Sequence, residues 1–194
     1  MDATERTLRV DATAGGATRT ARIARDAGLV LAGSVAVALA AQIAVPFPGS
    51  LVPVTAQTFA LLVVGISLGA RRGAMALGLY LLEGLAGLPV FAGGIGGPAA
   101  FVGPTAGYLL AFPSAALVAG ALASPRASAP RIVAASLVSH GVIFVAGLAW
   151  LSRFVGAEQV VATGLVPFLP GEALKIGATL LVLKGWSLAR GRSR

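Results

Sequence analysis

The stretch RIVAASLVSHGVIFVAGLAWL, residues 131–151, indicates the class of fold most clearly. It is apolar along almost its whole length, and it matches the length of about 20 residues that spans a bilayer as a helix. Five further apolar runs occur at 28–46, 53–69, 73–89, 107–123 and 164–186. The runs have helical length and lack the alternation that the strands of a membrane barrel require. We therefore expect an all-α, polytopic membrane protein with six transmembrane helices.

Composition excludes several other classes of protein. Of the 194 residues, 57% are hydrophobic and only 11% are charged, against about 25% charged residues in soluble domains. A mean hydropathy of +0.88 excludes a water-soluble enzyme, a disordered chain and a disulfide scaffold. With no Cys and one His, we expect no metal centre. The net charge of +8 lies between the apolar runs, so it does not indicate nucleic-acid binding.

The basic residues indicate an orientation in the membrane. Cytoplasmic loops carry an excess of Lys and Arg. If the N-terminus is cytoplasmic, thirteen of the fifteen Lys and Arg residues are cytoplasmic, Arg153 is outside and Lys175 lies within a span. We predict both termini in the cytoplasm, and the protein in the cell membrane. We expect a polar basic N-terminal tail at 1–27, loose or partly helical, a six-helix membrane domain at 28–186 and a basic C-terminal tail at 187–194. A cleavable signal peptide ending near Ala38-Leu39-Ala40 is the less favoured alternative, because the charged lead is long.

A few polar side chains lie inside the predicted spans, where they are costly and usually mark binding sites or pathways. Gln57, Glu83, Glu172 and Lys175 come from three runs and all fall in or near the outer half of the membrane. We expect a pocket that opens to the outside. The alternative is a structural ion pair, such as one between Glu83 and Lys175. His140, in the middle of the fifth run, is either a proton carrier or a structural histidine.

The start of the last run suits a small ligand. Glu172 and Lys175 are three residues apart and share one helix face. Pro170-Gly171 before them predicts a broken or late-starting helix. Tyr80 lies one turn from Glu83 on the same predicted face, and Tyr108 and Phe91 would supply apolar walls. These groups suit a ligand with a carboxylate and an amide-like head.

Two other patterns have alternative interpretations. Gly65–Gly69 matches Gly-x-Ser-x-Gly, but that nucleophile motif needs a strand–turn–helix context, and we expect these glycines to let helices approach closely. A membrane enzyme would use Ser67 or Ser139 with His140. The Gly- and Pro-rich segment 89–105 is either a gate or a plain connection. Small residues at every fourth position of the first run would form a flat surface for a partner subunit: Ala32, Ala36, Ala40 and Ala44.

Four motifs follow one another along the chain: PVTAQT at 53–58, GLPVFAGG at 87–94, GPTAGYL at 103–109 and PGEALK at 170–175. This order resembles the BioY family, the biotin-binding S-components of energy-coupling factor (ECF) transporters. The resemblance covers about 28–186. It implies six helices with both ends cytoplasmic, and capture of biotin from outside in a pocket closed by external loops.

The resemblance also implies partners and site residues. A transmembrane T-component and two ATPases would supply the energy, and the chain itself has no ATP-binding motif, cofactor or catalytic residue. The alanine stripe would dock the T-component. Family members tend to have Pro-Gly-Asp-x-x-Lys where this chain has Glu172 and Lys175. The expected biotin-binding residues are Gln57, Tyr80, Glu83, Phe91, Thr105, Tyr108, Glu172 and Lys175. Another small vitamin as ligand, or a structural membrane protein without a ligand, are the alternatives.

Overall fold

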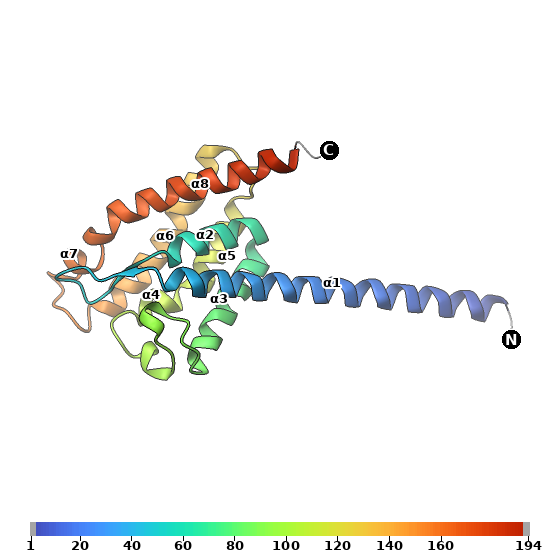
Figure 1. Cartoon of the computed structure of the whole chain (residues 1–194), viewed down its shortest axis with the longest axis horizontal. Coiled ribbons are helices and arrows are strands. Elements are labelled where there is room, and N and C mark those ends of the chain that lie inside the picture. Colours follow the sequence, from blue (N-terminus) through green and yellow to red (C-terminus); the bar gives the residue numbers. More distant parts are fainter. Residues whose placement is uncertain (1–2, 192–194) are drawn as a thin grey trace.

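The computed structural model of the chain describes residues 3–191 and is mostly helical. Its elements are α1 (Ala3–Ala41), β1 (Ala44–Val45), β2 (Val54–Thr55), α2 (Gln57–Leu68), α3 (Ala70–Leu85), η1 (Ala92–Gly94), η2 (Pro98–Phe101), α4 (Ala106–Leu110), α5 (Phe112–Leu122), α6 (Ala129–Leu151), α7 (Val160–Gly164), η3 (Val166–Phe168) and α8 (Leu169–Gly191). Figure 1 shows that the N-terminal half of α1 extends beyond the other helices. The helix therefore continues into the predicted tail at 1–27.

Within the described residues, three helical segments are long and apolar enough to cross a membrane: Arg19–Ala41, Ala129–Leu151 and Val160–Ala189. The helices α2 and α5 are apolar but shorter, with 12 and 11 residues. Large apolar side chains on the long helices point outward, and Leu174, Leu181 and Val145 are 73–77% exposed. Apolar surface of this kind is expected where a helix faces lipid.

The first predicted run ends earlier than expected. The helix α1 stops at Ala41, and Ala44 lies in β1, where it pairs with Thr55 of β2. Pro46 and Pro48 follow, and a residue before proline avoids the helical conformation. The prediction of a four-residue alanine stripe is therefore wrong at Ala44. Ala32 and Ala36 are exposed on α1, and Ala40 is half-buried.

Two other predicted runs are interrupted. The run 107–123 consists of α4 and α5, which meet at Ala111, with Pro113 in the first turn of α5. The run 164–186 begins with α7 and η3, and α8 starts at Leu169 with Glu172 in its first turn. The late-starting helix predicted from Pro170-Gly171 is thus confirmed.

Close contacts between glycines and alanines hold the helices together. A Cβ atom on Gly65 of α2 would lie only 2.8 Å from the carbonyl oxygen of Ala116 in α5. This confirms that Gly65 allows close helix approach. Gly69 has another role: its φ of +81° forms the one-residue connection between α2 and α3, a conformation that favours glycine.

The connections gather at two ends of the molecule. At one end, Ser67 of α2, the α5–α6 loop and Trp186 of α8 line a common pocket, and Asp26 of α1 pairs with Arg72 of α3 at 2.9 Å. At the other end lie the β1–β2 hairpin and α7 (Figure 1). The largest part of the aromatic-lined cavity described in the next section lies toward this second end.

Candidate functional site

A cavity of about 460 Å³ opens among α2, α4, α6, α8 and the segment that connects α3 to α4. This volume lies in the usual range for small-ligand sites. Aromatic side chains form much of its wall: Phe91, Tyr108, Phe112, Phe144 and Phe168. Polar side chains enter it at a few positions: Thr55, Gln57, Thr58, Thr105, Glu172 and Lys175. The combination suits a ligand with an apolar body and polar ends.

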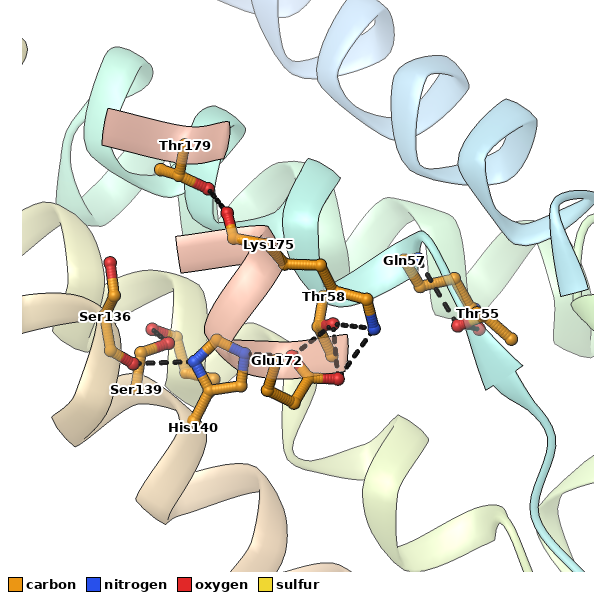
Figure 2. A network of polar contacts seen from close by, with 10 residues as sticks. Thr55, Gln57, Thr58, Ser136, Ser139, His140, Glu172, Lys175 and Thr179 are labelled. Carbon is orange, nitrogen blue, oxygen red and sulfur yellow. Dashed lines mark hydrogen bonds and ion pairs between the residues drawn. The ribbon is translucent and has the colours of Figure 1, made fainter. Parts of the chain in front are cut away.

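The first two turns of α8 carry the charged part of the site (Figure 2). The Lys175 Nζ lies 2.7 Å from Oε1 of Glu172 and donates to Oγ1 of Thr58 at 3.0 Å. The Thr58 hydroxyl in turn donates to Oε2 of Glu172 at 2.9 Å. These contacts hold the Glu172 carboxylate next to the Lys175 ammonium. Both groups are largely buried and therefore shielded from most water.

His140 of α6 completes this cluster. Its Nε2 is hydrogen-bonded to Oε2 of Glu172, and its Nδ1 lies 2.8 Å from the carbonyl oxygen of Ser136, one helical turn earlier. Both His140 and Glu172 are buried, with 5% and 6% of their surfaces exposed. His140 does not line the cavity but lies behind Glu172.

Gln57 is held by hydrogen bonds to a residue of β2 and a residue of α3. The Thr55 hydroxyl donates to its amide oxygen at 2.8 Å, and its amide nitrogen donates to the Tyr80 hydroxyl. The Tyr80 hydroxyl then donates to the carbonyl oxygen of Val90 at 3.2 Å. Gln57 is therefore linked through Tyr80 to the segment after α3, which contributes Phe91 to the cavity wall.

The aromatic wall is also anchored. The ring of Phe91 packs edge-on against Tyr80, with ring centroids 5.3 Å apart. Tyr108 stacks on Phe168 at 6.4 Å, and its hydroxyl donates to the carbonyl oxygen of Gly164 at 2.9 Å. These contacts connect the segment after α3, the helix α4 and the α7–α8 region around one cavity.

Six of the eight predicted site residues line the cavity: Gln57, Phe91, Thr105, Tyr108, Glu172 and Lys175. Tyr80 lies behind Gln57 instead. Glu83 lies away from the cavity lining and accepts a hydrogen bond from Ser34 of α1 at 2.5 Å. The helix α3 packs against both α1 and α2, so Tyr80 and Glu83 face different neighbours. The alternative ion pair of Glu83 with Lys175 is also not formed, because Lys175 pairs with Glu172.

Sequence reasoning does not identify Thr58, Phe144 and Phe168 as site residues. Thr58 directly follows Gln57, and its residue type alone gives no signal. The two phenylalanines look like ordinary apolar residues of a span. His140 stands out as an intramembrane polar residue, but its partner Glu172 is 32 positions away, and only the packing of α6 against α8 brings them together.

The serines considered for an enzyme do not form a nucleophile pair with His140. The Ser139 hydroxyl donates to the carbonyl oxygen of Ala115 at 2.9 Å. The two ring nitrogens of His140 face other groups: Nδ1 faces the carbonyl oxygen of Ser136, and Nε2 faces the carboxylate of Glu172. Ser67 lines a separate pocket at the opposite end of the molecule. This arrangement offers binding groups rather than an activated hydroxyl.

Comparisons with known proteins identify relatives of this chain. The model of the BioY family matches residues 9–192. The probable biotin transporter BioY of Pyrococcus horikoshii is 36% identical over 131 residues, which cover 68% of this chain and 78% of that protein. The biotin transporter BioY2 of Lactococcus lactis is 36% identical over 173 residues, which cover 85% and 90% of the two chains.

A solved structure shares the fold. The crystal structure of the S-component for biotin from an ECF-type ABC transporter superposes with a TM-score of 0.76 at 22% identity, over 89% of this chain and 93% of that one. Because the family model matches residues 9–192 and both transporters are 36% identical to this chain, the chain belongs to the BioY family.

Proposed function

We propose that this chain takes up biotin as the membrane-embedded substrate-binding subunit of an ECF transporter. The observation that carries the proposal is the aromatic cavity with Glu172 and Lys175 in its wall, in a chain whose relatives are named biotin transporters. Biotin has an apolar ring system and chain, a ureido group and a carboxylate. The cavity offers an acceptor in Glu172, a cation in Lys175 and an amide in Gln57 for these polar groups.

The substrate enters from outside in this proposal. The cavity lies toward the end that carries the β1–β2 hairpin and α7, while the opposite end carries most of the basic loop residues. Arg71, Arg72, Arg126 and Arg131 fall at or beside the connections of that opposite end. By the positive-inside rule this end faces the cytoplasm. In this proposal the chain crosses the membrane six times, and both of its termini lie on the same cytoplasmic side as these arginines.

The segment 1–27 is, in this proposal, a basic cytoplasmic extension of the membrane domain at the N-terminus, and 187–194 is one at the C-terminus. Residues 1–2 and 192–194 lie outside the described residues. The membrane domain between these extensions is the part that holds the cavity.

Energy for uptake comes from other chains in this proposal. A transmembrane T-component docks on α1, where Ala32 and Ala36 expose a smooth surface, and two ATPases hydrolyse ATP. The likeness of the fold to an S-component from an ECF-type ABC transporter supports this arrangement. The bilayer is the remaining partner, and biotin is the ligand.

Uptake of labelled biotin by cells that lack their own biotin transporter tests this function. The chain is expressed alone and together with an ECF T-component and its two ATPases. We expect saturable uptake that unlabelled biotin suppresses and that unlabelled riboflavin or thiamine does not. Membrane-inserted chain that gives no biotin uptake in either case would contradict the proposal. Suppression by another vitamin would instead assign a different ligand.

A further inference from the structure

His140 has an acceptor at each ring nitrogen. A carbonyl oxygen only accepts hydrogen bonds, so Nδ1, which faces Ser136, carries a proton. The other nitrogen faces a carboxylate oxygen of Glu172. For that contact to be a hydrogen bond, one further proton must lie between the two groups. The pair therefore holds one proton more than a neutral imidazole beside an ionised carboxylate.

The proton count fixes the charge of the site. If the extra proton is on the ring, His140 is positive and Glu172 negative; if it is on the carboxyl group, both are neutral. The pair is neutral in either case, and the Lys175 ammonium leaves a net charge of +1. Glu172 and Lys175 are the only Asp, Glu, Lys or Arg side chains among the described residues that line the cavity.

Few other groups influence this proton. The helices α2, α4, α5, α7 and α8 pack against α6. Near His140, α8 contributes Glu172 and Lys175, α4 contributes the Tyr108 phenol, and α2 contributes the Thr58 hydroxyl. Phe144 stacks against the imidazole, with ring centroids 6.4 Å apart. A partly buried +1 charge attracts an anion more strongly than a solvated one does.

We propose that His140 is a positioning residue that shares a proton with Glu172 and thereby keeps the ligand site at +1, which selects a ligand that carries a carboxylate. This inference rests on biotin being the ligand. When the shared proton is removed, the imidazole lone pair faces the carboxylate and the site becomes neutral. A site without the shared proton therefore loses its preference for an anionic ligand over a neutral one of similar shape.

Equilibrium binding of biotin and of its uncharged analogue biotin amide to the purified full chain, both at one pH, tests the proposal. His140→Gln retains an amide that can donate to Glu172 but adds no charge to the pair. We expect the wild type to bind biotin at least tenfold more tightly than biotin amide. We expect His140→Gln to lose most of this preference. Ser139→Ala, which removes a neighbouring buried hydrogen bond, should keep the preference of the wild type.

The outcomes separate the inference from the function. A wild type that binds biotin and biotin amide with equal affinity, or a His140→Gln variant that keeps the full preference of the wild type, would overturn the role of His140 and leave biotin binding intact. His140→Leu removes both hydrogen bonds, and we expect it to bind biotin more weakly than His140→Gln; equal affinities would also overturn the role. A folded wild type that binds no biotin would refute the proposed function itself.

Discussion

At the residue scale, the site depends on side chains that do not touch the cavity themselves. Tyr80 is fully buried and connects Gln57 to the backbone of Val90. Glu172 is fixed by His140, Thr58 and Lys175. Through these contacts the Glu172 carboxylate connects α8 to both α2 and α6.

Tyr80→Phe tests the link between Gln57 and the covering segment. The substitution keeps the ring that packs on Phe91 but removes the hydroxyl that accepts from Gln57 and donates to Val90. A net contribution of about 0.5–1.5 kcal/mol is typical for one such hydrogen bond, and this hydroxyl makes two. We expect the dissociation constant for biotin to rise about tenfold, with a small change in melting temperature.

Titration of purified Tyr80→Phe with labelled biotin measures this effect. Thermal melting of the same sample separates weaker binding from loss of fold. An unchanged dissociation constant would show that the hydroxyl does not position Gln57 for the ligand.

The types of residue in the site could be predicted from the sequence, but not their pairing. Gln57, Glu172 and Lys175 stand out because polar groups are rare inside spans. Glu83 stands out for the same reason, yet it bonds to Ser34 of α1 and does not line the cavity. Sequence spacing places Tyr80 and Glu83 near one another on a helix, whereas the positions of the neighbouring helices decide which of them faces the site.

At the scale of elements, close packing of α4 against α6 positions the aromatic wall. A Cβ atom on Gly147 of α6 would lie 2.3 Å from the Tyr108 ring. Gly141 on the same helix has nothing within 4 Å of such an atom. The two glycines therefore differ in packing, although both occupy the interior of one helix.

Gly147→Ala and Gly141→Ala form a matched pair. We expect Gly147→Ala to destabilise the protein by about 1–3 kcal/mol, because Tyr108 must move, and to weaken biotin binding. Gly141→Ala should leave binding unchanged and stabilise the helix by up to about 1 kcal/mol. Thermal melting in detergent and biotin titration measure both effects. Equal melting temperatures for the two variants would contradict the packing of α4 on α6 described here.

The apolar runs in the sequence predicted where helices occur, but they predicted the first and last residues of those helices less accurately. Each of the six runs contains a helix, because long apolar segments have few other ways to satisfy their backbone groups in lipid. The ends depend on local and tertiary features. Pairing of Ala44 with Thr55 delays the start of α2 to Gln57, and the break at Ala111 divides the fourth run.

At the scale of the whole molecule, charge and shape define two different ends. Loop residues at one end are basic, and the cavity lies toward the other. This asymmetry predicts which connections face the cytoplasm. The chain has no native cysteine, so single cysteines report their own position without interference.

Ser128→Cys and Ala157→Cys test the orientation. Both positions are exposed, Ser128 before α6 and Ala157 after it. We expect a membrane-impermeant maleimide to label Cys at 157 in intact cells. The same reagent should label Cys at 128 only after the cells are permeabilised. The reverse pattern would invert the topology, and labelling of both in intact cells would place the two loops on one side.

Biotin binding in the cavity that holds Lys175 is the property on which the proposed function depends. It is measured by equilibrium binding of labelled biotin to the purified chain in detergent, for the wild type, Lys175→Met and Lys184→Met. Lys184 is the matched control, because it bonds to Ala127 between α5 and α6, at the opposite end. We predict saturable binding by the wild type and by Lys184→Met. Loss of the cavity ammonium should cost at least about 2 kcal/mol, so that Lys175→Met binds about 30-fold more weakly or worse. A folded Lys175→Met that binds biotin as tightly as Lys184→Met, or a folded wild type that does not bind it, would show that this cavity is not the biotin site.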